Sequence, residues 1–256
     1  MRTVRSTGEV QTQLSDDDRA KLGRIVALFG PFVELEPIAR YRTMTPDESW
    51  LVLVEQVCVM GSARHIGRLH ANPEKYEEFK KAISLQSLSR QQDPVHYLSK
   101  TLRDFSATRF CNKSAEKIAS MLKSPEVFQG DELILLQGLS HEGDAIQTRD
   151  ELIRRNPIFR LKSTSDFMIA VGLSHDVIAL DTRVIGVLQK HFGYNVTPGR
   201  IQSNWDLYLS LEATLREFCY EQGVSLALLD RLLFKFNVLS AIELVVKYPE
   251  LTHRFG

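Results

Sequence analysis

One lysine in the C-terminal half of the chain has surroundings that could support covalent chemistry. Lys162 directly precedes Ser163-Thr164-Ser165, and the residues from Ser163 to Val171 have helical apolar spacing. Lys162 is therefore expected at or just outside the first turn of that helix. There the positive end of the helix dipole and partial burial both favour a neutral amine. A neutral lysine amine is a nucleophile that can form a Schiff base with a sugar aldehyde.

An aspartate follows nineteen residues later, where an apolar run ends. Val177-Ile178-Ala179-Leu180 leads into Asp181, and a helix is predicted over Thr182–Phe192. An aspartate before a helical run is typical of an N-cap, which contributes about 1 kcal/mol. The spacing alone favours capping over catalysis. The two roles are compatible, because a capping carboxylate keeps a second oxygen that can face a substrate.

The segment just before the lysine is rich in positive charge. Its basic residues are Arg149, Arg154, Arg155, Arg160 and Lys162, and only Asp150 and Glu151 oppose them. Such a cluster can be a solvated helix face. It can also be a surface that contacts phosphate groups, since arginine side chains bind anions together with the free N–H groups of a helix start.

The whole chain is balanced in charge. Its 256 residues contain 32 Lys+Arg and 32 Asp+Glu, and 43% of them are hydrophobic. This composition excludes a disordered or fibrous protein. Zero net charge argues against binding nucleic acid or membranes by bulk electrostatics, although a local basic patch remains possible.

The cysteines and the apolar runs restrict the cellular setting. Cys58, Cys111 and Cys219 lack the spacing of a metal site, an iron–sulfur cluster or a disulfide scaffold, so a reducing compartment is expected. Charged or amide residues interrupt the runs Trp50–Met60 and Leu226–Val246, and no apolar stretch follows the first residues as in a signal peptide. We expect an intracellular protein, cytoplasmic and nucleoid-associated if the source is prokaryotic, with no membrane partner.

The elements that must position these residues are nearly all predicted as helices. Four helix starts are marked by capping residues, at Ser15-Asp16, Thr45-Pro46, Asn72-Pro73 and Asp93-Pro94. Further helices are predicted over Lys113–Leu122, Asp131–Leu139, Ala145–Arg155, Ser163–Val171, Thr182–Phe192, Asn204–Gln222, Ser225–Phe236 and Ser240–Tyr248, with a break after the second helix at Gly61. The sequence therefore predicts a single all-α fold of around ten helices.

The order of these features resembles a known family. A helix, a short turn, Lys162 at the start of the next helix and an apolar loop ending in Leu180-Asp181-Thr182-Arg183-Val184 are similar to the helix-hairpin-helix DNA glycosylases. Within that family the chain looks most like the 8-oxoguanine DNA glycosylase/lyase branch. The segments Arg109–Ile118 and Leu228–Phe234 also resemble that branch, and the likeness extends from Trp50 to Phe236.

The resemblance implies a fold, a reaction and a partner. It implies one glycosylase fold over residues 1–256, with two helical subdomains and the helix-hairpin-helix, at about 145–172, at the cleft between them. The N- and C-terminal helices would form one subdomain and the middle helices the other. Lys162 would attack C1′ of a nucleotide in damaged duplex DNA, and Asp181 would stabilise the positive charge that develops on the sugar.

The same resemblance implies the substrate and the cofactor requirement. The base would be extruded and an oxidised purine, with 8-oxoguanine as the first choice, removed by a monomer that also cleaves the strand. That chemistry needs no metal or redox cofactor.

Two family features are replaced in this chain. The hairpin Gly-x-Gly is replaced by Ile158 and Arg160, so a charged contact from Arg160 would substitute for backbone amides, with Arg154 and Arg155 nearby. At the position where the family inserts a wedge into DNA, the chain has Met60, with Arg64 and His65 able to reach the opposite base. A glycosylase for another modified base, and a non-catalytic DNA- or protein-binding member of the fold, therefore stay open as alternatives.

Other side chains are weaker candidates for the substrate pocket. Glu55 and Gln56 interrupt an apolar helix, so at least one of them is expected to face a polar cleft. Phe234 could stack on a base, although core packing is the simpler expectation, and Trp205 is expected to pack its own helix. His65 and His70 are five residues apart, which is poor geometry for a metal on one helix face, so no metal site is predicted.

Overall fold

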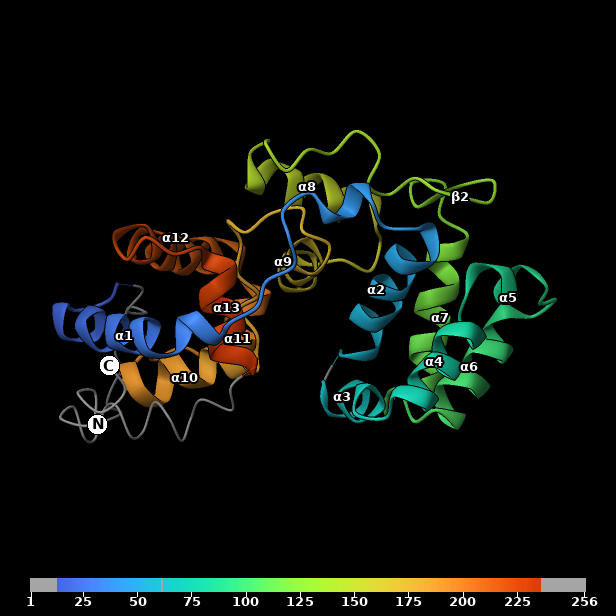
Figure 1. The fold of residues 1–256 in the computed structure, drawn as a ribbon, viewed down its shortest axis with the longest axis horizontal. Helices are drawn as coiled ribbons and strands as arrows, with labels where there is room; N and C mark the ends of the chain where they lie inside the picture. The colour runs from blue at the N-terminus through green and yellow to red at the C-terminus, as the bar shows by residue number, and fades with distance from the viewer. Residues whose placement is uncertain (1–12, 61, 236–256) are drawn as a thin grey trace, which may run out of the picture. The chain divides into compact units, whose positions relative to one another are not determined.

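The computed structural model describes residues 13–60 and 62–235 (Figure 1). These residues form two compact units. One unit is the middle segment Glu36–Ser174, and the other combines the described residues up to Leu35 with those from His175 onward. Gly61, Phe236 and the helix predicted over Ser240–Tyr248 lie outside the described residues. The described residues are overwhelmingly helical, so the predicted all-α fold class is confirmed.

The middle unit contains the helices that surround the candidate nucleophile. In chain order its elements are η2 Arg40–Arg42, α2 Pro46–Cys58, α3 Arg64–His70, α4 Pro73–Ala82, α5 Leu85–Ser89, α6 Pro94–Asp104, α7 Cys111–Leu122, β1 Phe128–Gln129, β2 Glu132–Leu133, α8 Ala145–Arg155 and α9 Leu161–Ala170. Helix α6 packs along α7, α8 along α9, and α2 touches α7 and α9.

The second unit is smaller in number of elements. They are α1 Asp16–Phe29, η1 Gly30–Phe32, α10 Thr182–Phe192, α11 Pro198–Ser203, α12 Trp205–Glu221 and α13 Leu226–Lys235. Helix α13 contacts α1, α10 and α12. The apolar side chains of α10 that it helps to bury include Val184, Ile185 and Leu188.

Capping residues explain where most helices begin. The side chain of Ser15 accepts a hydrogen bond from the Asp18 amide at the start of α1. At α2, the Thr45 hydroxyl accepts from the Glu48 amide, while the Glu48 carboxylate accepts from the Thr45 amide at 2.7 Å. This reciprocal pair satisfies two N–H groups that the helix itself cannot. These starts, and those at Asn72 and Asp93, are as the sequence predicted.

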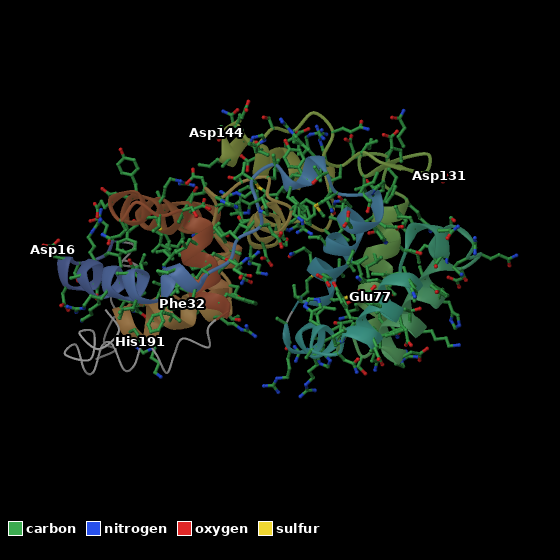
Figure 2. The ribbon with its side chains drawn as sticks, in the orientation of Figure 1. Asp16, Phe32, Glu77, Asp131, Asp144 and His191 are labelled. Carbon is green, nitrogen blue, oxygen red and sulfur yellow. The ribbon has the colours of Figure 1, made fainter. Side chains whose placement is uncertain are left out.

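The helix predicted over Asp131–Leu139 is wrong. The segment instead contains the second strand of a small antiparallel hairpin, in which Phe128 pairs with Leu133 and Gln129 with Glu132. Gly130 has a φ of 60°, so the chain reverses at Gly130-Asp131, and Figure 2 labels Asp131 at this turn. A glycine in the left-handed region favours a tight turn over a helix. The apolar run that follows is too short for its periodicity to distinguish a helix from this arrangement.

The segment that precedes α2 is fixed to the C-terminal end of α9. The Ala39 amide donates to the Gly172 carbonyl at 2.8 Å, and the Arg40 guanidinium donates to the Ala170 carbonyl. Gly172 has a φ of 65°, and a Cβ atom there would lie 2.0 Å from the Pro37 carbonyl oxygen. Only glycine fits this position, both for its backbone conformation and for the space.

One prediction about an aromatic side chain is also wrong. Trp205 was expected to pack its helix, but it is 43% exposed. It is the first residue of α12, so its side chain lies at the helix end, outside the buried face that Leu211, Leu215 and Phe218 form. Trp50, by contrast, is fully buried and donates from Nε1 to the Ile83 carbonyl.

Candidate active site

Lys162 lies in the first turn of α9, as its position in the sequence predicted. The N-cap of this helix is Arg160, so Lys162 is the second helical residue. Its side chain is 24% exposed, and its Nζ lies 3.3 Å from Oδ2 of Asp166, one helical turn further along. The amine is therefore held by a carboxylate while part of its surface stays open to solvent.

Helix α2 contributes a buried amide to the same carboxylate. Gln56 Nε2 donates to Asp166 Oδ2 at 3.2 Å, and Gln56 is only 6% exposed. Its other amide atom, Oε1, is buried and accepts no hydrogen bond from any described residue. The structure thus brings Gln56 and Lys162 together around Asp166.

Asp181 caps α10 and uses only one oxygen to do so. Its Oδ1 accepts from the amides of Arg183 at 2.8 Å and Val184 at 2.9 Å. Within residues 13–60 and 62–235, no group donates a hydrogen bond to its Oδ2. The half-buried Asp181 therefore combines an N-cap with a carboxylate oxygen that is not used by the fold.

The apolar loop before Asp181 is held by buried polar side chains. The amides of Ile178, Ala179 and Leu180 donate in turn to Glu212 Oε1, Asp230 Oδ1 and Tyr208 Oη. The Tyr208 hydroxyl also donates to the Ile178 carbonyl at 2.6 Å. An extended buried segment has no helix or sheet partners, so its amides need such acceptors.

No role of Tyr208, Glu212 or Asp230 was predicted from the sequence. A signal was present: acidic side chains interrupt the apolar faces of two C-terminal helices, at Glu212 and Asp230, which are 0% and 1% exposed. A buried acid must find hydrogen-bond donors, and here the donors are backbone amides of the loop.

The basic cluster before Lys162 is divided between structural and exposed residues. Arg149 is fully buried and donates to Ser165 Oγ, so the expectation that it joins a phosphate-binding surface is wrong. Arg155 donates to the carbonyls of Leu135 and Gln137, which fixes α8 to the segment after the hairpin. A charged side chain beside such carbonyls satisfies them where no backbone amide can.

Two arginines of the cluster remain exposed. Arg154 makes two hydrogen bonds to Glu151, and these bonds with the Arg155 bond lower the pKa of Glu151 to about 2. Arg160 is exposed and donates only to the adjacent Phe159 carbonyl. Of the cluster, Arg160 is therefore the guanidinium least engaged by the fold.

The amides at the hairpin positions are already hydrogen-bonded within the chain. The Ile158 amide donates to Asn156 Oδ1 at 3.1 Å, and the Arg160 amide donates to Ser163 Oγ at 2.9 Å. Asn156 is fully buried, so this arrangement is part of the fold. The turn between α8 and α9 thus satisfies the N–H groups of Ile158 and Arg160 within the chain.

The residues considered for a DNA wedge lie at the end of α2 and in α3. Arg64 is exposed. His65 Nδ1 is 3.2 Å from the Ser106 carbonyl oxygen, and Met60 Sδ is 3.1 Å from Lys117 Nζ. Helix α3 was not predicted from the sequence, because seven residues are too few to show helical periodicity.

Glu55 belongs to a different network from its neighbour Gln56. Its Oε1 lies 2.7 Å from His70 Nε2 and accepts from the Tyr76 hydroxyl at 2.7 Å. The hydrogen bond to Glu55 raises the pKa of His70. Burial, and after it the charge of Glu55, raises the pKa of Tyr76.

Phe234, the other pocket candidate from the sequence, is half-buried. The guanidinium carbon of Arg183 lies over its ring, 4.3 Å from the ring centre.

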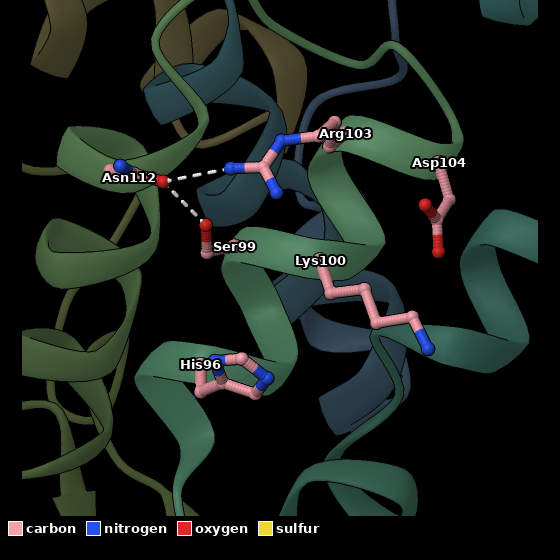
Figure 3. A pocket seen from close by; sticks show the side chains of 6 residues that line it. All are labelled: His96, Ser99, Lys100, Arg103, Asp104 and Asn112. Carbon is pink, nitrogen blue, oxygen red and sulfur yellow. Dashed lines mark hydrogen bonds between the residues drawn. The ribbon is translucent and has the colours of Figure 1, made fainter.

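A separate pocket of about 560 Å³ lies on α6 and the start of α7 (Figure 3). Ser99 Oγ and the Arg103 guanidinium both donate to Asn112 Oδ1 there. The remaining lining residues are His96, Lys100 and Asp104. This pocket pairs no nucleophile with a base and contains neither Lys162 nor Gln56, so we do not place the candidate chemistry in it.

The described residues contain neither a membrane-spanning helix nor a cluster of metal ligands. No helix among them is long and apolar enough to cross a membrane. Within the same ranges, no three His, Cys, Asp or Glu side chains gather as metal ligands. Lys162 belongs to the unit Glu36–Ser174 and Asp181 to the other unit, and each is described within its own unit.

Comparisons with known proteins support this fold. No protein-family model and no curated protein matches the chain. The crystal structure of the 8-oxoguanine DNA glycosylase of Thermotoga maritima is similar to it, with 22% identity, a TM-score of 0.59 and coverage of 86% of this chain and 95% of that one.

A second structure is also similar. It is the Methanocaldococcus jannaschii 8-oxoguanine glycosylase/lyase in complex with a 15mer DNA containing 8-oxoguanine, with 18% identity, a TM-score of 0.54 and coverage of 86% and 90%. The fold expected from the sequence is thereby confirmed: this chain has the fold of the helix-hairpin-helix 8-oxoguanine DNA glycosylases.

Proposed function

We propose that the protein is a DNA glycosylase with abasic-site lyase activity, which removes an oxidised purine, 8-oxoguanine first of all, from duplex DNA. The observation that carries this proposal is the position of Lys162. It is a part-exposed lysine in the first turn of α9, within a fold that it shares with an 8-oxoguanine glycosylase/lyase. A lysine amine placed beside a sugar is the group that a lyase needs.

In the proposed reaction the neutral Lys162 amine attacks C1′ of the damaged nucleotide. The Nζ–C1′ bond forms as the bond from C1′ to the base breaks, and the departing base takes up a proton. The bond from C1′ to O4′ then breaks, O4′ takes up the remaining amine proton, and a C1′=N Schiff base forms. Removal of a proton from C2′ then expels the 3′ phosphate, which cleaves the strand.

Asp181 would supply the negative charge for this reaction. A carboxylate stabilises the positive charge that builds up on the sugar as the base departs. Its Oδ2, which caps no amide, is the oxygen available for that role, while Oδ1 keeps the carboxylate fixed on α10. The same carboxylate would assist the proton transfers.

DNA contact would come from a small set of side chains. Arg160 and Arg154 are exposed near Lys162 in the chain and would contact phosphates, while Arg155 would act mainly by holding α8 in place. Met60 would act as the wedge that replaces the extruded base, with Arg64 and His65 at the opposite base. Phe234 would be a stacking partner for the base.

Strand-cleavage assays test the proposal. The substrates are a duplex with 8-oxoguanine opposite cytosine and a duplex with a single abasic site. The wild-type protein is expected to cleave both, and Lys162→Gln is expected to cleave neither. Lys81→Gln, which changes an exposed lysine of α4, is the matched control and should behave as wild type. A wild-type protein that binds but cuts neither duplex would contradict the proposal.

A further inference from the structure

The carboxylate beside Lys162 also fixes the orientation of a buried amide. Gln56 Nε2 donates to Asp166 Oδ2 at 3.2 Å, and Lys162 Nζ lies 3.3 Å from the same oxygen. An ionised carboxylate only accepts hydrogen bonds, so the reverse orientation of the Gln56 amide would place two oxygens against each other. Nε2 must therefore face Asp166, and Oε1, on the same carbon, must face away from that bond.

This orientation leaves a buried acceptor without a donor. Gln56 is 94% buried, from its 6% exposure, and none of residues 13–60 or 62–235 donates to its Oε1. An unsatisfied buried oxygen destabilises a fold, and an apolar side chain of the same length would avoid that cost. A glutamine at this point of α2 is explained if a donor reaches Oε1 at some stage of the protein's work.

We propose that Gln56 is a base-reading residue, whose Oε1 accepts an N–H group of the extruded base while Lys162 reacts at the sugar. Asp166 is then the positioning residue that keeps the acceptor side of the Gln56 amide turned toward the base. This inference rests on the proposed function. It adds a substrate class. A base is accepted if the edge that meets α2 has an N–H donor, as 8-oxoguanine has. A base whose edge has only acceptors is rejected.

The neighbouring side chains do not offer the same role. Glu55, next in sequence, is already engaged by His70 and Tyr76. Asp166 is shared between Gln56 and Lys162, so a substitution of Asp166 would disturb the nucleophile Lys162 as well as the orientation of Gln56. Gln56 is joined to Lys162 by hydrogen bonds through Asp166, and it is not itself the nucleophile, so it can be tested separately from the covalent step.

The test compares two substrates that differ by the presence of a base. Single-turnover rates are measured for wild type and Gln56→Met on a duplex with 8-oxoguanine opposite cytosine and on a duplex with an abasic site. Methionine has the length of glutamine but no strong acceptor. Ser49→Ala, another buried polar position of α2, is the matched control, and thermal melting establishes that each variant is folded.

We expect Gln56→Met to lower base excision about 10- to 100-fold more than it lowers cleavage at the abasic site, because a buried N–H of the base loses its acceptor. Ser49→Ala should leave that ratio at the wild-type value. If folded Gln56→Met loses the same factor in rate on both substrates, Gln56 only supports Lys162. If Gln56→Met excises 8-oxoguanine at the wild-type rate, Gln56 makes no contact that matters with the base. Either result overturns the inference.

The proposed function fails in a different way. If the wild-type protein does not cleave the abasic duplex, the lyase proposal itself is wrong, whatever Gln56 does. If it cleaves the abasic duplex but does not excise 8-oxoguanine, the lyase stands, while the oxidised-purine substrate and the inference that Gln56 reads it are both overturned.

Discussion

The structural task of Asp181 and the chemical task proposed for it fall on two different oxygens. Oδ1 accepts both capping hydrogen bonds of α10, and the loop before it is fixed by Tyr208, Glu212 and Asp230. The capping role that the spacing favours and the catalytic role that the family resemblance implies are therefore compatible in one side chain. They can be separated by substitution.

Asp181→Asn should separate them, because asparagine caps a helix as well as aspartate but has no charge. We expect its free energy of unfolding to stay within about 0.5 kcal/mol of wild type, and Asp181→Ala to lose about 1 kcal/mol. Both variants should excise 8-oxoguanine about 10²- to 10³-fold more slowly. Urea unfolding and single-turnover kinetics measure the two effects. An Asp181→Asn protein with wild-type rates would reduce Asp181 to a cap.

Residue types and local spacing were enough to predict Lys162 in the first turn of its helix and Asp181 at the next helix start. They marked Gln56 as a pocket candidate, but they could not predict its contact with Asp166, which is 110 residues away in sequence. The contact depends on how α2 packs on α9, and local periodicity contains no information on that packing. Arg149 shows the same limit, since its sequence neighbours suggested a surface while its side chain is buried against Ser165.

At the scale of elements, caps and prolines predicted most helix starts, because they act within one turn. The short helices α3, α5 and α11 were missed because five to seven residues make fewer than two helical turns, too few for an apolar period to repeat. The β1–β2 hairpin was missed because its strands are only two residues long.

Gly172 is the position where one element constrains another most tightly. Gly172→Ala should destabilise the protein by about 2–3 kcal/mol or more, since it adds a Cβ at a positive φ and against the Pro37 carbonyl. Gly67→Ala, in α3 with open space around it, is the control and should be neutral or stabilising by up to about 1 kcal/mol. Thermal and urea unfolding measure both. Equal effects would show that the contact of residues 37–40 with α9 does not matter.

The network of Glu55, His70 and Tyr76 joins α2, α3 and α4 and should make stability depend on pH. Its hydrogen bond to Glu55 raises the pKa of His70, so the folded state holds the proton more tightly. The stabilisation is therefore complete below about pH 6.5, the usual histidine pKa, and is lost as pH rises through the raised value.

Melting temperatures of wild type and His70→Gln at several pH values test this dependence. The wild-type advantage should be larger at pH 5.5 than at pH 8.5, and an NMR titration of His70 should give a pKa above its ordinary value. If the melting temperatures of the two proteins change with pH in parallel, the pair of His70 and Glu55 does not stabilise the packing of α2, α3 and α4.

At the scale of the whole molecule, charge balance limits how DNA can be bound. With 32 positive and 32 negative residues there is no general attraction to DNA, so the proposed binding must depend on few phosphate contacts. The structure also reduces the number of basic residues near Lys162 that are available for phosphate contacts, because Arg149 is buried and Arg155 is bound to carbonyl groups.

Salt dependence of DNA binding distinguishes these arginines. Arg160→Ala should reduce the slope of log K against log salt by about 0.9, the value for one lost phosphate contact. Arg155→Ala should instead lower the melting temperature, because it leaves the carbonyls of Leu135 and Gln137 without their donor. Fluorescence anisotropy at several salt concentrations measures the slopes. If Arg155→Ala reduces the slope and Arg160→Ala does not, Arg155 is the residue that contacts a phosphate.

The most direct test of the central claim is to trap the covalent intermediate. Wild-type protein is incubated with a duplex that contains one abasic site, reduced with sodium borohydride, digested and mapped by mass spectrometry. We predict a stable DNA–peptide adduct on Lys162 that is absent in Lys162→Gln. No adduct, or an adduct on another amine that persists in Lys162→Gln, would contradict the claim.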